Sequence, residues 1–205
     1  MKVLLINGSP HKNKCVNRAL VEIKTQLEKQ GVKGEIIWLG TKPMQDCISC
    51  GGCQNKGKCV FDDVVNEVAA KLEQAEGIVI GSPVYYGGPN GRITSFMDRL
   101  CYSAGTKLDG KVAASVVSCR RGGATAAYER LNMYFGMLNC IVPAAQYWNQ
   151  VHGSTVEQVE QDLEGLQTMR NLADNIAWTI KAQKAAYEKG NKKPEREPIT
   201  YTNFI

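Results

Sequence analysis

The sequence contains no long hydrophobic segment. No apolar run among its 205 residues approaches the length that crosses a membrane. The N-terminus, MKVLLINGSP, has only four consecutive apolar residues before Asn7, too few for the core of a signal peptide. We therefore expect a cytoplasmic protein, in which thiols are kept reduced.

Groups for acid–base or nucleophilic catalysis are also scarce. His11 and His152 are the only histidines, neither lies near a plausible nucleophile in the sequence, and we find no paired carboxylates and no Ser/His/Asp set. The net charge is only +5, and no dense Lys/Arg run is interleaved with aromatic residues, which argues against a nucleic-acid partner. A reaction that a bound cofactor performs needs none of these groups.

What the sequence does contain is an alternation of short apolar runs and longer stretches of helical periodicity. Strands are predicted at residues 3–6, 34–40, 77–83 and 111–118, and a fifth within Asn139–Trp148. Asp62 or Asp63 is predicted to cap a helix, and a long closing helix is predicted from Val156 to Ile180. Apolar strands separated by helices predict an α/β fold, with a parallel sheet covered on both faces.

The length favours one domain rather than two. We assign it to residues 1–186, with a cysteine-rich loop inserted at 46–60. Residues 187–205 differ in composition and are predicted to form a C-terminal arm. This arm is either a disordered end or a segment that docks on a neighbouring subunit through Tyr201, Phe204 and Ile205.

Three loops are predicted at the carboxyl ends of the strands, where ligands bind in such sheets. The first, NGSPHKNKCVNR, opens a helix, whose free N–H groups and positive end suit a phosphate. It matches neither G-x-G-x-x-G nor G-x-x-x-x-G-K-[ST], which counts against a dinucleotide fold and a P-loop. The second, SPVYYGGPNG, offers two tyrosine faces, and the third, SCRRGGAT, has two arginines and two glycines before a helix. Each alone is also compatible with an ordinary turn, but together they predict a pocket for a flat, phosphate-tailed ligand such as FMN.

Segments along nearly the whole chain resemble the flavodoxin-like NADPH-dependent FMN reductase superfamily, in particular its iron–sulfur flavoprotein branch. They are INGSPHKN, GSPVYYG, SCRRGG, YWNQVHG and TNFI. The resemblance implies a flavodoxin-like three-layer sandwich with a five-stranded parallel sheet, in the strand order 2-1-3-4-5. It also implies non-covalent FMN and a homodimer or homotetramer.

The resemblance also implies an FMN-dependent oxidoreductase. NAD(P)H or a ferredoxin would supply electrons, and the cluster or a bound acceptor such as a quinone would receive them. The alternatives are a non-enzymatic electron carrier like flavodoxin and a regulatory domain of the same fold. A response-regulator receiver is disfavoured, because it needs an acidic cluster after the first strand, where this chain has Asn7.

The resemblance places FMN contacts in all three loops. It assigns the phosphate to Ser9, His11, Asn13, Cys15, Val16 and Asn17. It assigns the ring and the ribityl chain to Pro83, Val84, Tyr85, Tyr86 and Gly87, and the polar edge of the ring to Ser118, Arg120, Arg121, Gly122 and Gly123. Many relatives carry a threonine where this chain has Val16, so here the phosphate must rely on backbone N–H groups, with Asn17 or Lys14 as substitutes.

Four of the eight cysteines lie close together, in the segment DCISCGGCQNKGKC. They are Cys47, Cys50, Cys53 and Cys59, and their C-x2-C-x2-C-x5-C spacing resembles compact iron–sulfur patterns. Neighbouring glycines supply the backbone freedom that such a turn needs. The resemblance implies a [4Fe–4S] cluster here, while a zinc site, a metal-free set of packed thiols and a Cys47–Cys50 disulfide remain as alternatives. Three other cysteines, Cys101, Cys119 and Cys140, are predicted to be small residues of the core.

Overall fold

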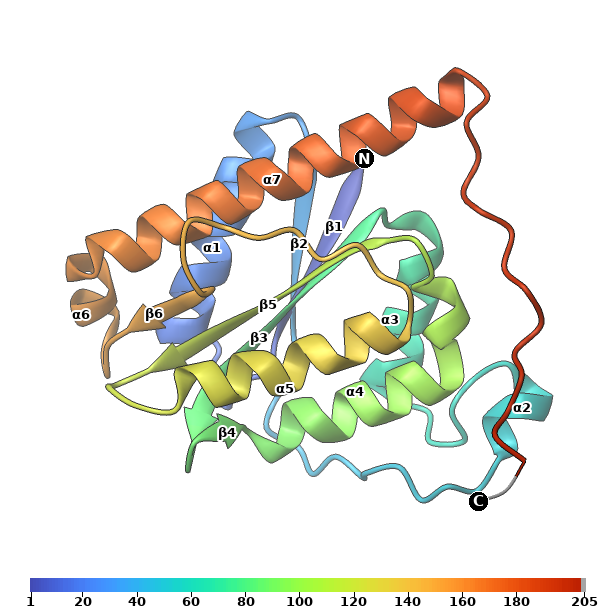
Figure 1. Ribbon diagram of the computed structural model, residues 1–205. Helices are drawn as coiled ribbons and strands as arrows, with labels where there is room; N and C mark the ends of the chain where they lie inside the picture. The colour runs from blue at the N-terminus through green and yellow to red at the C-terminus, as the bar shows by residue number, and fades with distance from the viewer. Residues whose placement is uncertain (204–205) are drawn as a thin grey trace.

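Five parallel strands form the centre of the computed structural model, which describes residues 1–203 (Figure 1). The strands are β1 (Lys2–Asn7), β2 (Lys33–Trp38), β3 (Gly77–Tyr85), β5 (Val112–Cys119) and β6 (Gln150–His152). Their order is β2-β1-β3-β5-β6, and the two-residue β4 (Gly88–Pro89) pairs antiparallel with the end of β3. The predicted flavodoxin-like order is therefore confirmed.

Helices cover both faces of the sheet. One face carries α1 (Cys15–Lys29), α6 (Val156–Gln161) and α7 (Leu163–Glu188), and the other carries α3 (Val64–Lys71), α4 (Gly91–Ala104) and α5 (Ala124–Met137). Side chains of β1 alternate between the two layers: Val3 and Leu5 join the α1/α7 core, whereas Leu4 and Ile6 join the α3/α4/α5 core. This double burial explains why the strand sequences are continuously apolar.

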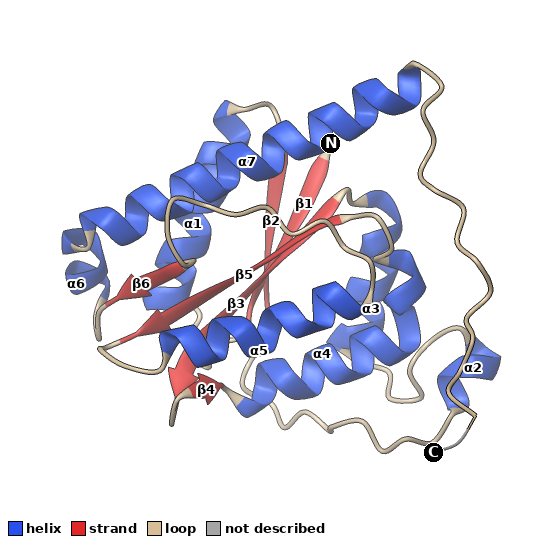
Figure 2. Cartoon of the chain, in the orientation of Figure 1, coloured by secondary structure: helices blue, strands red, loops and turns tan. Residues whose placement is uncertain are grey.

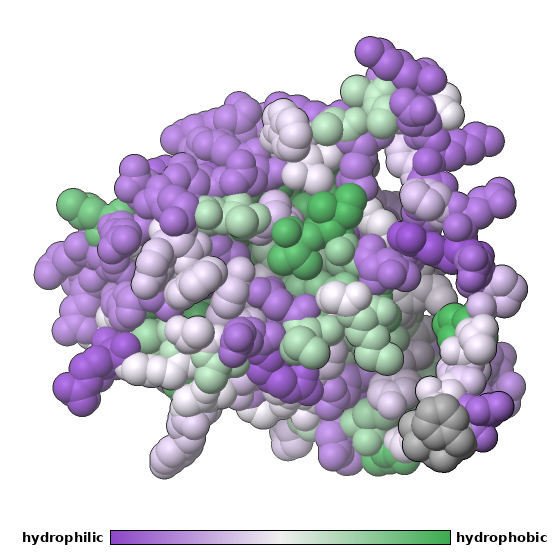
Figure 3. Space-filling view, in the orientation of Figure 1, coloured by the Kyte–Doolittle hydropathy of each residue, from purple (hydrophilic) through white to green (hydrophobic). Residues whose placement is uncertain are grey.

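The fifth strand was predicted too early in the chain. Within residues 139–148 only Ile141 pairs with β5, through an isolated bridge in which its N–H donates to the Lys111 carbonyl at 2.9 Å. Pro143, which has no N–H, follows, and regular pairing begins only at Gln150. The intervening segment crosses the molecule between α7 and α5 as a loop, and its Ile141 and Val142 are exposed. Figure 3 shows a hydrophobic patch in the same region of the surface.

The predicted closing helix is two helices. The helix is interrupted at Asp162, which follows the last residue of α6. Its side chain caps α7 by accepting a hydrogen bond from the Gly165 N–H at 3.0 Å. The other carboxylate oxygen of Asp162 accepts from the His152 N–H at 2.6 Å, at the end of β6. A short polar side chain that satisfies free N–H groups stabilises this break.

Beyond α7, residues 189–203 contain neither helix nor strand and are exposed. The arm is attached by Lys193 and Arg196, which both form ion pairs with Asp109. Tyr201 is exposed, and Phe204 and Ile205, the other residues predicted to dock on a subunit, lie outside the described residues. Within residues 1–203, none of the helices combines the length and the apolar character needed to span a bilayer.

Candidate functional site

The three predicted loops leave the sheet at the same edge. The parallel register aligns Asn7 of β1 with Gly81 of β3, and Pro83 of β3 with Ser118 of β5. The strands therefore end close together, beside the hairpin formed by β3 and β4 (Figure 2). We call the loops 8–14, 83–87 and 118–123 at this edge the carboxyl rim.

The first rim loop is shaped by two buried polar side chains. Asn7 accepts a hydrogen bond from the Ser9 N–H at 3.0 Å and donates to the Lys12 carbonyl at 3.1 Å. Ser9, which is only 4% exposed, accepts from the His11 N–H through its hydroxyl oxygen at 3.1 Å. The hydroxyl proton of Ser9 remains available for a ligand, whereas His11 and Asn13 are exposed.

The N-terminus of α1 presents free backbone donors. Its first hydrogen bond runs from the Arg18 N–H to the Lys14 carbonyl, and Lys14 provides no side-chain cap. The N–H groups of residues 15–17 therefore have no helical partner, and the first turn contains no acidic residue. The side chain of Val16 is buried, so this residue can reach a ligand only through its N–H. Such an end attracts anions.

The second rim loop is a tight hairpin turn. Tyr86 and Gly87 have φ angles of 51° and 82°, both left-handed, between the paired residues Tyr85 and Gly88. Tyr85 is 48% exposed and Tyr86 is fully exposed. The two aromatic rings are thus outside the core, where they can meet a planar ligand.

The third rim loop packs directly against the second. Gly123 has a φ of +88°, and a Cβ placed on it would lie 2.7 Å from the Cα of Gly87 and 3.0 Å from Cγ1 of Val84. Glycine is therefore required both by the backbone conformation and by the close approach. Arg120 and Arg121 are exposed beside this contact.

Two residues that brace the rim were missed by the sequence analysis. Asn90, 4% exposed, caps α4 through the Ile93 N–H and also donates to the Gly8 carbonyl at 2.8 Å. Trp38 donates from its indole to the Ser9 carbonyl at 2.8 Å. An asparagine directly before an apolar helix is a capping signal that could have identified Asn90, but no local signal marks Trp38.

The four clustered cysteines line one cavity of about 160 Å³ beside α4, together with residues such as Phe61 and Tyr102. We call residues 46–60 the cysteine loop, which contains the short helix α2 (Gly52–Lys56). Its turns use left-handed φ angles at Ser49, Gly51 and Gly57. Gly51 and Gly57 flank α2 and provide the backbone freedom that such turns require.

The donor set of this cavity consists of thiols, which bind zinc as well as iron–sulfur clusters. Across the described part of the chain, no three His, Cys, Asp or Glu side chains lie close enough together to hold one metal ion. All eight cysteines are free, and the structure contains no Cys47–Cys50 disulfide. A four-iron cluster is held by four thiolates, and the four loop cysteines are all among the residues that line this cavity.

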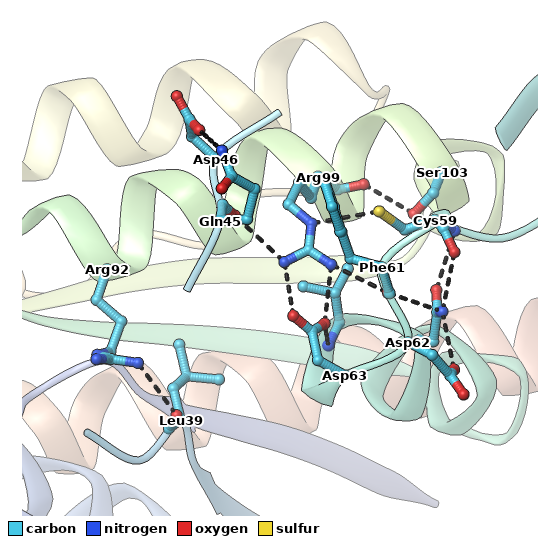
Figure 4. Close-up of polar contacts among 12 residues, drawn as sticks. Leu39, Gln45, Asp46, Cys59, Phe61, Asp62, Asp63, Arg92, Arg99 and Ser103 are labelled. Carbon is cyan, nitrogen blue, oxygen red and sulfur yellow. Dashed lines mark hydrogen bonds and ion pairs between the residues drawn. The ribbon is translucent and has the colours of Figure 1, made fainter. Parts of the chain in front are cut away.

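Arg99 of α4 braces the cysteine loop, and the sequence analysis missed it (Figure 4). Its guanidinium is 1% exposed and forms a bidentate pair with Asp63, at 2.7 and 2.9 Å. Asp63 is also the N-cap of α3, and it is one of the two residues that the sequence offered for this role. Burial disfavours the charge on Arg99, but hydrogen bonds with Asp63 and Cys59 outweigh this effect and raise the pKa of Arg99 above its ordinary value.

Comparisons with characterised proteins agree with this arrangement. The chain is 32% identical over 191 residues to an iron–sulfur flavoprotein of Methanocaldococcus jannaschii, a match that covers 88% of this chain and 98% of the relative. It is 26% identical over 180 residues to an iron–sulfur flavoprotein of Methanosarcina thermophila, covering 86% and 93%.

Solved structures share the fold at low sequence identity. An NADH:FMN oxidoreductase, EmoB, superposes with a TM-score of 0.64 at 15% identity, over 87% of this chain and 89% of that one. The NAD(P)H:acceptor oxidoreductase FerB of Paracoccus denitrificans superposes with a TM-score of 0.65 at 14% identity, over 88% and 97%. The model of the family described as NADPH-dependent FMN reductase matches residues 1–154. The chain therefore belongs to the NADPH-dependent FMN reductase family.

Proposed function

We propose that this protein is an FMN-dependent oxidoreductase that takes electrons from NAD(P)H, and that its cysteine loop holds a [4Fe–4S] cluster. The observation that carries the FMN assignment is the first turn of α1, where three backbone N–H groups lack helical partners next to a loop built around Asn7 and Ser9. FMN, when bound, supplies the hydride and electron transfer. The cluster assignment is supported by the shared cavity of the four thiols and by the names of the relatives.

Each rim loop then has a distinct task. The N–H groups of residues 15–17, with Ser9, Asn13 and Asn17, hold the phosphate. The hairpin at 83–87 supports the ring and the ribityl chain. Arg120 and Arg121 lie beside the polar edge of the ring, where a positive charge stabilises an anionic reduced flavin. A ferredoxin is the alternative electron donor, the acceptor is a small molecule such as a quinone, and the active form is a homodimer or homotetramer.

The phosphate assignment can be tested by comparing FMN with riboflavin, which lacks the phosphate. Asn17→Asp puts a negative charge in the first turn of α1, where the charge stabilises the helix but repels a phosphate. We expect FMN affinity, measured by fluorescence quenching, to fall about tenfold, or about 1.4 kcal/mol. Riboflavin affinity should stay unchanged, and equal losses for both ligands would contradict the assignment.

The redox assignment is tested on anaerobically purified protein. Flavin, iron, sulfide and zinc are measured per chain, and NADH and NADPH oxidation is followed with a quinone as acceptor. We expect one FMN, four iron atoms and steady-state oxidation of at least one nucleotide. Protein that binds FMN but exchanges only single electrons would instead be a carrier, and protein that takes up no FMN would refute the proposal.

A further inference from the structure

One buried side chain connects the two ends of the cysteine loop. Arg99 donates from Nη1 to the carbonyl of Gln45, before the loop, at 3.2 Å, and from Nη2 to the carbonyl of Phe61, after it, at 3.2 Å. Both nitrogens also donate to Asp63 (Figure 4). Arginine is rarely buried this completely, so its position requires these acceptors.

The remaining donor of Arg99 points at a cysteine. Its Nε–H donates to Sγ of Cys59 at 3.3 Å. A guanidinium has five N–H groups, and the two bonds to carbonyls, the two to Asp63 and the one to sulfur account for all five. Lysine has three donors and no planar fork, so it cannot reproduce this set.

Cys59 is held more firmly than the other three loop cysteines. In addition to the bond from Arg99 to its sulfur, its N–H donates to Oδ1 of Asn66 at 3.0 Å, and its carbonyl accepts from Nδ2 of Asn66 at 3.1 Å. By contrast, Cys50 is exposed, and Cys53 makes a long sulfur contact of 3.6 Å to the Tyr102 carbonyl. The sulfur of Cys59 therefore has a fixed place before any ligand arrives.

We propose that Arg99 is the positioning residue of the cysteine loop: it fixes the Cys59 sulfur and, through its Nε–H, raises the reduction potential of the cluster that the loop takes up. This inference rests on the proposed cluster assignment. A hydrogen bond to a ligating sulfur withdraws negative charge and favours the reduced state, and such bonds are among the determinants of cluster potentials. Asp63 acts in the opposite sense, because its carboxylate compensates the charge of Arg99.

Two variants should shift the cluster potential in opposite directions. Arg99→Lys keeps the positive charge but removes the Nε–H donor, so the potential should fall, and resistance of the cluster to a chelator should decrease about 10–100-fold. Asp63→Asn keeps an N-cap for α3 but removes the compensating charge, so the potential should rise. Arg92→Lys is the matched control, because Arg92 lies on the same helix and donates only to the Leu39 carbonyl at 3.5 Å (Figure 4).

The measurement is an anaerobic redox titration of the cluster signal, with the FMN potential of the same sample as the reference. Opposite shifts in the two variants, with neither in the control, support the proposal. Unchanged potentials, or shifts of the same sign, would overturn it, because a purely structural role predicts lost loading without opposite shifts.

A measurement on the unaltered protein covers the case in which a variant does not fold. With ¹⁵N-labelled arginine, one exchange-protected Nε–H resonance should shift or broaden when the cluster is reduced. If no arginine Nε–H resonance responds, the proposed bond to a ligating sulfur is refuted. Protein that binds FMN but takes up neither iron nor sulfide would overturn the cluster assignment itself, and this inference with it.

Discussion

The carboxyl rim and the cysteine loop are stabilised by different parts of the chain. The rim depends mainly on the main chain: strand register aligns it, the Gly8 N–H donates to the Gly81 carbonyl at 2.9 Å, and Gly123 packs on Gly87. The polar side chains that brace it, such as Asn7 and Asn90, are short and buried. The cysteine loop lies outside the sheet, and the polar side chains of Arg99 and Asn66 hold it. A site supported by the sheet therefore needs small residues at its contacts, whereas a site on a loop needs a few long polar side chains.

The largest effect is expected when the main brace of the cysteine loop is removed. Arg99→Ala leaves Asp63 without its partner and two carbonyls without donors, which should lower the free energy of unfolding by about 3 kcal/mol. That value is at the low end for a broken buried pair, because Asp63 is about one-third exposed and can be hydrated. Urea unfolding measures the loss, and proteolysis should become faster within residues 46–60.

The control for this change is Arg92→Ala, on the same helix. Arg92 makes one long hydrogen bond, so its loss should cost about 0.5 kcal/mol. Equal losses in the two variants would show that the cysteine loop does not depend on Arg99.

On the rim, the expected weak point is a backbone contact rather than a charged side chain. Gly123→Ala forces an L-residue into a left-handed φ, which costs about 1–2 kcal/mol of conformational energy. The new Cβ also collides with the Gly87 backbone. The hairpin must therefore move. We expect the FMN dissociation constant to rise about tenfold or more, where tenfold corresponds to a loss of about 1.4 kcal/mol in binding free energy. Gly136→Ala is the control, because this residue lies on α5 outside the rim, no atom lies within 4 Å of a Cβ there, and φ is not left-handed.

Two asparagines allow the rim and the loop to be compared with the same substitution. Asn90→Ala removes a buried helix cap and the donor to the Gly8 carbonyl, and it should lower the free energy of unfolding by about 2 kcal/mol. Asn66→Ala removes hydrogen bonds at a half-buried position, and it should lower the free energy of unfolding by about 1 kcal/mol. FMN affinity should fall only in the first variant, and cleavage within the cysteine loop should increase only in the second. Loss of FMN affinity in both would show that the two regions are coupled.

The sequence predicted those parts of the molecule that depend on local patterns. Continuous apolar runs located four of the five strands, and the acidic residues before an apolar helix narrowed its cap to Asp62 or Asp63, of which the structure uses Asp63. The loops of the rim follow from the strand ends. The fifth strand was misplaced because the run at 139–148 is apolar but interrupted by a proline, so only Ile141 pairs.

The braces of the site could not be predicted in the same way. Arg99 lies among apolar residues of α4, and its partner Asp63 is 36 residues away. No local pattern reports such a pairing, which depends on how α3 and α4 pack. The break at Asp162 has the same origin, because this side chain is engaged by the His152 N–H at the end of β6.

The smallest expected effects distinguish the thiols of the two regions. The rim contributes Cys119, which is 4% exposed, and burial raises its pKa. In the α3/α4/α5 core, burial raises the pKa of Cys101 and of Cys140 to about 12. Because only thiolates react with iodoacetamide, these three cysteines should be spared when the cluster-free chain is alkylated at pH 8. Mass mapping measures this, and early labelling of Cys119 would show that the rim opens as readily as the loop.

The same thiols predict a loss of stability at alkaline pH. When the chain unfolds, each thiol of Cys101 and Cys140 returns to a pKa near 9.0, so between pH 9.0 and about 12 the folded state binds more protons than the unfolded state. Stability from these groups is complete below pH 9.0 and decreases as pH rises towards 12. A Cys101→Ala/Cys140→Ala variant lacks this contribution. The difference between the urea midpoints of the unaltered chain and of the variant should therefore be constant up to pH 9 and become smaller above it. A difference that stays constant to pH 11 would mean that both thiols ionise as freely in the folded chain as in the unfolded one, and that the α3/α4/α5 core around them is open to solvent.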